Sequence, residues 1–251
     1  MLPNTNYLLY KILKPKLNDL FFLFLASVSV YSCLNNSAIE RLSIAGESIS
    51  LNKSLVSDSS IQQIYLPYKK NLDSIMDVVL CYSPQFLEKT KPESALSNWM
   101  ADVCLISVPE KQVDFCLLNY GGIRSTLPRG NITRKNIFEL MPFENELVIV
   151  ELSISKFEKV LTYLAQSNGH PISGIRLNFY GEKIWHSLDL NSSVRILTSD
   201  YLANGGDKMF FFSDSLSCKK TNLKIREVLL THCKQIDTIR ASIDQRFSYE
   251  Q

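Results

Sequence analysis

Residues 118–130 (LNYGGIRSTLPRG) combine the residue types that suit a binding turn at the end of an apolar run. The candidate residues are Asn119, Gly121, Gly122 and Arg124. Paired glycines let the backbone take positive φ values and let another group approach closely. The asparagine side chain offers both a donor and an acceptor, and the guanidinium group suits a carboxylate or a phosphate. The segment therefore predicts a turn that presents polar groups to a ligand.

A second glycine pair lies in residues 201–212 (YLANGGDKMFFF), where the candidate residues are Tyr201, Asn204, Gly205, Gly206 and Asp207. Residues 141–145 (MPFEN) add Phe143 at the start of a loop. Together these rings and polar groups would form a platform for a flat heterocycle, and stacking on an aromatic ring contributes roughly 1–3 kcal/mol per base. Each segment alone is more typical of a turn or of core than of a site. The MFFF run is expected to be a core strand.

Apolar periodicity predicts the elements that must hold these segments. Helices are expected over 59–80, 93–106, 132–141, 155–167 and 222–234, and strands over 113–119, 146–153, 174–180 and 193–202. Thr133 is expected to cap one helix, and Ser155 and Glu158 have the spacing of a capping box. The interspersed strands and helices predict one α/β (α+β) domain over residues 59–251, with a mixed sheet and flanking helices.

The N-terminal residues have the order of a secretory leader. Three lysines precede an apolar run over 20–33, which is shorter than the ~20 residues of a membrane-spanning helix. The run ends Val-Tyr-Ser-Cys, which resembles a bacterial lipobox. Residues 1–32 are therefore expected to be a lipoprotein signal peptide, with Cys33 lipidated and residues 33–58 forming a tether and two short strands. This predicts a lipid-anchored protein of the bacterial cell envelope, periplasmic or surface-facing; an uncleaved anchor is the alternative.

Charge and cysteine usage exclude some classes of protein. The chain has 27 basic and 25 acidic residues, and removal of residues 1–32 leaves equal numbers, so nothing indicates nucleic-acid binding. Of the six cysteines, none has the C-x-x-C spacing of a zinc site. Cys218 and Cys233 could bridge in an oxidising compartment, which the sequence leaves open.

The ordered series from LNYGGIRS through MPFEN to DYLANGGD resembles the C-terminal domain of the 5'-nucleotidase family over most of the chain. The resemblance implies that the domain binds a nucleoside or nucleotide and stacks its base between Phe143 and Tyr201. It also implies that Asn119 and Arg124 contact the base or ribose and the phosphate end, and that Asp207 binds ribose hydroxyls. One departure concerns phosphate binding, because Lys89 to Pro92 stand where family members place a further arginine.

The family's hydrolysis takes place in a separate metallophosphatase domain with two metal ions, for which this sequence lacks the motifs. His170, His186 and His232 stand in no metal-binding context and are expected to be structural or solvated. No cofactor is therefore expected in this chain, and divalent metals are expected only in a partner metallophosphatase.

Three functions fit these features. The first is the nucleoside-binding half of a split nucleotidase that acts with a metallophosphatase polypeptide. The second is a non-catalytic surface lipoprotein that binds nucleosides or nucleotides. The third, a structural protein that has lost the ligand, is disfavoured because the candidate residues are present together.

Overall fold

The computed structural model describes residues 24–25, 58–181, 183–190 and 192–250. The expected lipidation site Cys33, the two strands expected before residue 58 and almost all of the expected signal peptide lie outside these residues. Asp58–Gln251 form one compact unit. In the described part of the chain, no helix is long and apolar enough to cross a membrane.

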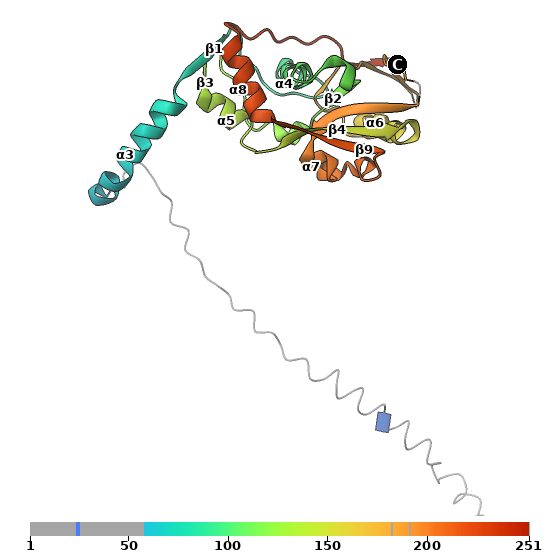
Figure 1. The fold of residues 1–251 in the computed structure, drawn as a ribbon, viewed down its shortest axis with the longest axis horizontal. Coiled ribbons are helices and arrows are strands. Elements are labelled where there is room, and N and C mark those ends of the chain that lie inside the picture. The colour runs from blue at the N-terminus through green and yellow to red at the C-terminus, as the bar shows by residue number, and fades with distance from the viewer. Residues whose placement is uncertain (1–23, 26–57, 182, 191, 251) are drawn as a thin grey trace, which may run out of the picture. The chain divides into compact units, whose positions relative to one another are not determined.

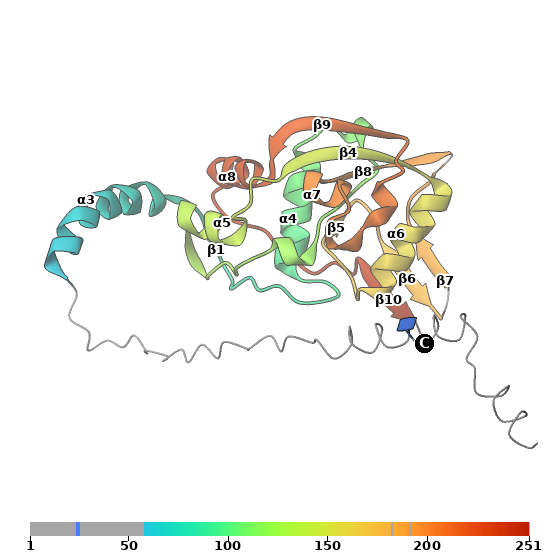
Figure 2. The same ribbon diagram turned by 90° about the horizontal axis from the view of Figure 1, so that it is seen from below.

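A five-stranded mixed sheet lies at the centre of this unit (Figures 1 and 2). Its strand order is β5 (Ile172–Ser173), β2 (Phe115–Leu117), β8 (Ser193–Ser199), β4 (Glu146–Ser153) and β9 (Ser217–Lys224). β2 and β8 run parallel, and the other neighbouring strands run antiparallel. The mixed sheet predicted from the sequence is therefore confirmed.

Helices cover both faces of this sheet because successive side chains of a strand point to opposite faces. In β4, Leu147 and Ile149 face a core that includes α4 (Ala95–Ile106), α5 (Arg134–Leu140) and α8 (Ile225–Gln235). Val148 and Val150 face a second core, which α6 (Ile154–Gln166) covers. The result is an α/β/α arrangement with the expected flanking helices.

Two smaller sheets extend this arrangement. β1 (Val79–Ser83) pairs with β3 (Gly130–Thr133) in antiparallel register. β6 (Leu177–Tyr180) lies between β7 (Lys183–His186) and β10 (Phe247–Glu250). Residues 79–80 were expected to continue the first helix, which is wrong: that helix, α3 (Ser59–Met76), ends before them and the chain becomes extended.

Side-chain caps set the start of two helices. Ser94 and Ser97 form a capping box at α4, and Thr133 caps α5 as expected, together with Asn136. At α6 the expected capping box of Ser155 and Glu158 is wrong. The helix begins at Ile154, directly after β4, and the Ser153 hydroxyl contacts the Ser155 hydroxyl at 3.1 Å instead of a backbone N–H.

The second glycine segment also differs from expectation. β8 ends at Ser199, and a short helix, α7 (Asp200–Ala203), starts where the strand was expected to continue. Phe210–Phe212 form a 3-10 turn, η4, in place of the expected strand. Phe211 and Phe212 are nevertheless buried, whereas Phe210 is 66% exposed. The cause is the preceding turn, which includes positive φ values at Asp207 and Lys208.

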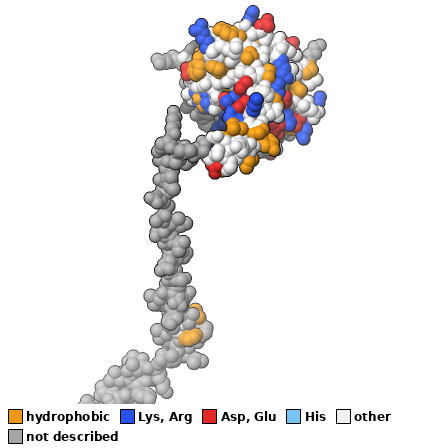
Figure 3. Space-filling view, turned by 90° about the vertical axis from the view of Figure 1, so that its left-hand side faces the viewer, with side chains coloured by type: hydrophobic (Ala, Val, Ile, Leu, Met, Phe, Trp, Pro, Cys, Tyr) orange, Lys and Arg blue, Asp and Glu red, His pale blue; other side chains and the backbone are white. Residues whose placement is uncertain are grey.

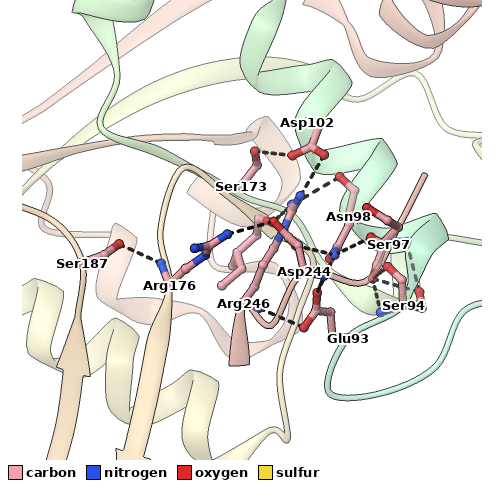
Figure 4. Close-up of polar contacts among 12 residues, drawn as sticks. Glu93, Ser94, Ser97, Asn98, Asp102, Ser173, Arg176, Ser187, Asp244 and Arg246 are labelled. Carbon is pink, nitrogen blue, oxygen red and sulfur yellow. Dashed lines mark hydrogen bonds and ion pairs between the residues drawn. The ribbon is translucent and has the colours of Figure 1, made fainter. Parts of the chain in front are cut away.

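A polar network centred on the buried residues Arg246, Glu93 and Asn98 ties the C-terminal segment to α4 (Figure 4). The guanidinium of Arg246, a residue only 7% exposed, donates to Asp102 and to Asp244, each at 2.8 Å. Glu93 accepts from the backbone N–H of Arg246 at 2.9 Å and from Asn98 at 2.6 Å. A buried charge is stable only when it is paired in this way, so the network fixes the last strand, β10, beside β6.

The surface combines apolar and charged groups. On the face shown in Figure 3, patches of apolar side chains lie among basic and acidic ones. α3 is an extreme case because none of its residues is buried, although it contains Ile64, Tyr68 and Leu72. This helix therefore presents an apolar surface outside the two cores.

Candidate functional site

The candidate site is a cavity of about 320 Å³ formed by loops at the ends of β2 and β8 and by the loop after α5. Its lining residues come from three separate segments: Asn119, Gly121, Gly122, Arg124, Phe143, Asn145, Tyr201 and Asp207. The structure thus brings together the two glycine segments and the MPFEN segment, which lie far apart in the sequence. Seven of these eight residues were predicted from the sequence.

Asn119 and the glycines after it form one wall of the cavity. A 3-10 turn, η2 (Tyr120–Gly122), follows Asn119 directly. The Asn119 amide donates to the Asp207 carboxylate at 2.7 Å, which joins the two glycine segments. A side chain at Gly122 would place its Cβ only 2.7 Å from the Asn119 side-chain oxygen. Gly122 is therefore needed for the position of Asn119.

Tyr201 and Asp207 form the opposite part of the lining. The Tyr201 hydroxyl donates to Asp207 Oδ1 at 2.9 Å. Gly206 lies against the Tyr201 ring, since a Cβ there would be 2.5 Å from a ring carbon. Asp207 has a φ of 51°, which is uncommon for a residue other than glycine. Its backbone carbonyl accepts from the Tyr163 hydroxyl at 2.8 Å, so the strained residue is held by the second core.

Phe143 is 41% exposed and lines the same cavity as Tyr201, which is 45% exposed. The loop that carries Phe143 is held by Arg226 of α8, a residue that the sequence analysis did not identify. The Arg226 guanidinium donates to the carbonyls of Met141, Pro142 and Phe143 at 3.0 to 3.4 Å. It also forms an ion pair with Glu144. Since Arg226 is only 6% exposed, it is a positioning residue for this aromatic ring.

Asn145 is the one lining residue that the sequence analysis missed. Its backbone carbonyl accepts from Ile225 at 3.0 Å, which holds it at the start of α8. The signal was present in the sequence, because Asn145 closes the MPFEN segment two residues after Phe143. Its side-chain amide adds a donor and an acceptor to the cavity lining.

Positive charge at the cavity comes from Arg124. Its side chain is exposed, its Nη1 donates to the Gly121 carbonyl at 3.3 Å, and its guanidinium lies 5.9 Å from the centre of the Phe143 ring. Lys89 lies nearby, but its amino group donates to the Ile123 carbonyl at 2.6 Å. Burial, together with the charge of Arg124, lowers the pKa of Lys89. Lys91 instead donates to the Ser167 carbonyl and does not line the cavity.

His170 supports the Asn119 turn from inside the protein. It is 6% exposed, and its Nδ1 accepts from the backbone N–H of Tyr120 at 3.1 Å. Burial lowers the pKa of His170 to about 4, so the ring is neutral near pH 7 and can act as this acceptor. His170 is thus a structural histidine, one of the two roles expected for it.

Three predicted site residues do not line the cavity. Asn204 donates its side-chain amide to the Asp200 carbonyl at 2.8 Å and thereby caps α7. Gly205 has a φ of 86° and lies against the Phe210 ring, and Gly206 lies against Tyr201. These residues shape the turn that presents Tyr201 and Asp207. Within the described ranges, no group of three or more His, Cys, Asp or Glu side chains is arranged to hold a metal ion.

The fold and the cavity define an α/β domain that joins two aromatic rings, an arginine and a carboxylate in one loop-lined pocket. The family model for the 5'-nucleotidase C-terminal domain matches residues 78–214. The chain belongs to this family, as its sequence resemblance implied.

Relatives and solved structures agree with this assignment. The apyrase of Tabanus yao is 29% identical over 146 residues, which cover 47% of this chain and 26% of the apyrase. Protein UshA of Yersinia enterocolitica is 22% identical over 188 residues, covering 67% of this chain and 33% of UshA. The chain thus spans about a quarter to a third of the length of these curated relatives.

A solved 5'-nucleotidase precursor from Thermus thermophilus has the same fold. It superimposes with a TM-score of 0.64 at 23% identity, covering 75% of this chain and 42% of the precursor. The α/β fold predicted from the sequence is therefore confirmed by this comparison as well.

Proposed function

We propose that this chain is the nucleoside-binding half of a 5'-nucleotidase-type hydrolase of nucleotide catabolism. A separate metallophosphatase polypeptide would supply the metal ions and the attacking water. The observation that carries this proposal is the cavity itself, where Phe143 and Tyr201 offer rings to a base. Holding the base and ribose would position the phosphate for the partner and so contribute through proximity.

The polar groups of the cavity suit the rest of a nucleotide. The two Asp207 carboxylate oxygens accept from Tyr201 and Asn119. A carboxylate has further acceptor capacity, so it can also accept from two ribose hydroxyls. Arg124 makes no ion pair with any described residue and is exposed at the cavity, where it suits a phosphate or its approach to the partner.

The partner would dock on α3. Large apolar side chains are exposed along this helix, including Ile64 at 70%, Tyr68 at 77% and Leu72 at 55%. An apolar surface of this kind is typical of an interaction site. α3 directly precedes residues 78–214, which match a C-terminal domain, so it lies where the rest of a longer relative would join. A metallophosphatase chain therefore fits this surface.

Calorimetry with adenosine, AMP and ADP tests the binding half of the proposal. Phe143→Ala and Tyr201→Ala should each weaken binding by about 5- to 150-fold, since stacking contributes roughly 1–3 kcal/mol per base. Phe210→Ala is the control, because Phe210 is an exposed phenylalanine, at 66%, beside the same turn but outside the cavity lining. If none of these ligands binds the wild-type chain, the proposal is wrong.

A second experiment tests the catalytic half. The purified chain is mixed with a metallophosphatase encoded beside it, and metal-dependent phosphate release from AMP is measured. Ile64→Glu with Leu72→Glu should abolish the gain in rate while leaving adenosine binding unchanged.

The proposal also includes a lipid anchor in the bacterial cell envelope. Fatty-acid labelling of the wild-type protein and of a Cys33→Ala variant tests this anchor, and the variant should not be labelled.

The cavity also supports the alternative, a non-catalytic surface lipoprotein that captures nucleosides or nucleotides. The described residues of this chain already bring two aromatic rings, an arginine and a carboxylate to one cavity, which would suit capture of a nucleoside without turnover. Nucleoside binding without any rate gain from a metallophosphatase would favour this alternative over the split enzyme.

A further inference from the structure

The segment after α8 returns along β1 and brings two cysteines into the same part of the core. The backbone N–H of Tyr82 donates to the Asp237 carbonyl at 2.9 Å, and the Ile239 N–H donates to the Tyr82 carbonyl at 2.8 Å. These bonds fix β1 beside the end of α8. Cys81 stands next to Tyr82 on β1, and Cys233 lies in the last turns of α8.

Both thiols point into the core between these two elements. Cys81 is 6% exposed and Cys233 is 0% exposed, and both belong to the core formed by α4, α5 and α8. The two thiols form a hydrogen bond with each other, and this bond lowers the pKa of the Cys81 thiol. Cys218, the pairing partner that the sequence left open for Cys233, is exposed on the edge strand β9.

We propose that Cys81 and Cys233 form a disulfide bond that joins β1 to α8 when the protein meets a disulfide oxidant. The Cys81 thiolate attacks one sulfur of a small disulfide such as oxidised glutathione, which releases one glutathione thiolate. Cys233 then loses its proton and attacks the Cys81 sulfur, which releases the second glutathione. Two cysteine thiols are oxidised by two electrons, and one small disulfide is reduced to two thiols.

This bond would hold β1, the strand that directly follows α3. α3 is joined to the rest of the domain through Asp77 and Val78, which lead directly into β1. A bond between β1 and α8 closes a loop that contains most of the domain, and long loops gain the most from a cross-link in the unfolded-chain entropy model. The oxidised protein, in which β1 is bonded to α8, is therefore expected to be more stable to unfolding than the reduced protein.

Refolding of the full chain from urea in a glutathione redox buffer tests the proposal, because both thiols are accessible while the chain is unfolded. After blocking of free thiols in denaturant, mass spectrometry of the unreduced digest should show a Cys81–Cys233 peptide pair. Cys104 and Cys116 are both 0% exposed and serve as internal controls that should remain blocked thiols. Recovery of Cys81 and Cys233 as blocked thiols under these conditions would overturn the proposal.

Thermal unfolding gives an independent measurement. The oxidised wild-type protein should melt several degrees above the same protein reduced with dithiothreitol. Cys81→Ala should remove this difference between the two conditions, and the matched Cys218→Ala variant should keep it. A difference that persists in Cys81→Ala would assign the effect to another cysteine and refute the pair.

Discussion

Gly122 lies so close to the Asn119 side chain that residue 122 has room for a hydrogen atom but not for a Cβ. Gly122→Ala should therefore push Asn119 away from Asp207 and separate the two glycine segments. The expected loss is about 1–3 kcal/mol of stability, as for an overpacked site, or a fall in Tm of several degrees. Differential scanning calorimetry of the ligand-free protein measures it.

Gly121→Ala is the control for this prediction. Its added Cβ would meet Asn119 and Asp207 at 3.5 and 3.6 Å, which is ordinary van der Waals contact. It should lower Tm much less than Gly122→Ala does. Equal losses in the two variants would mean that the backbone turn, not the Asn119 contact, sets the cost.

The His170 ring predicts how stability depends on pH. An unperturbed histidine has a pKa of 6.5, whereas burial lowers that of folded His170 to about 4. As the pH falls, the unfolded chain takes up this proton first, so the stability that is present above pH 6.5 is lost between pH 6.5 and 4. The loss is up to roughly 3 kcal/mol at about 1.4 kcal/mol per pKa unit.

Urea unfolding between pH 7.5 and pH 4.5 measures this loss. His170→Asn is the comparison, because its side-chain oxygen can still accept from the Tyr120 N–H but does not titrate. The variant should show a shallower fall in stability than the wild type over this range. Parallel curves for the two proteins would assign the pH dependence to other groups.

At the scale of elements, α8 determines where the Phe143 loop lies. Arg226→Met should leave three loop carbonyls without their donor, which costs roughly 1–3 kcal/mol per unsatisfied buried group, and should weaken nucleoside binding. Lys224→Met is the matched control. Lys224 also pairs with Glu144, at 2.6 Å, but both groups are more than half exposed, so the pair contributes about 1 kcal/mol or less.

Calorimetry measures the nucleoside affinity of both variants, and urea unfolding measures their stability. A weaker affinity in Arg226→Met, with an affinity like that of the wild type in Lys224→Met, is the expected result. If Lys224→Met weakens binding as much, the Glu144 side chain rather than the loop backbone controls Phe143.

The elements also show what could be predicted from the sequence. Strand β4 was predicted with its observed bounds because it is an apolar run buried on both faces of the sheet. Helix α8 was predicted from its apolar spacing, but its expected start at residue 222 was wrong, since residues 222–224 belong to β9 and the helix begins at Ile225. β10 was not predicted, and the 3-10 turn over Phe210–Phe212 was expected to be a strand, since the conformation of both segments depends on distant partners such as Glu93 and Tyr163. Seven cavity residues were found through ordered motifs. Arg226 was missed because a single arginine on a helix carries no local sign of the carbonyls that it meets in the fold.

At the scale of the whole molecule, the two ends of the described unit contribute very differently to stability. A chain that starts at Asp77 loses α3, none of whose residues is buried, and should unfold within a few degrees of the full chain. A chain that ends at Ile243 loses Arg246 and Phe247, which are both 7% exposed.

The second truncation should lower Tm by roughly 6–20 °C or prevent folding. Loss of a buried aromatic residue alone costs about 3–5 kcal/mol, and each kcal/mol shifts Tm by roughly 2–4 °C in a protein of this size. Circular dichroism melts of both truncated proteins measure this asymmetry. Similar Tm values for the two would show that the polar network around Arg246 is dispensable.

The position of Arg246 has a consequence for biosynthesis. Glu93 and Asp102 are made early, but their shared partner follows 153 and 144 residues later. A nascent chain cannot place Arg246 until that residue has left the ribosome, however long synthesis pauses before it. The network around Glu93 and Asp102 is therefore completed only after nearly all of the domain has been synthesised, and a chain that is truncated before Arg246 lacks the shared partner of both residues.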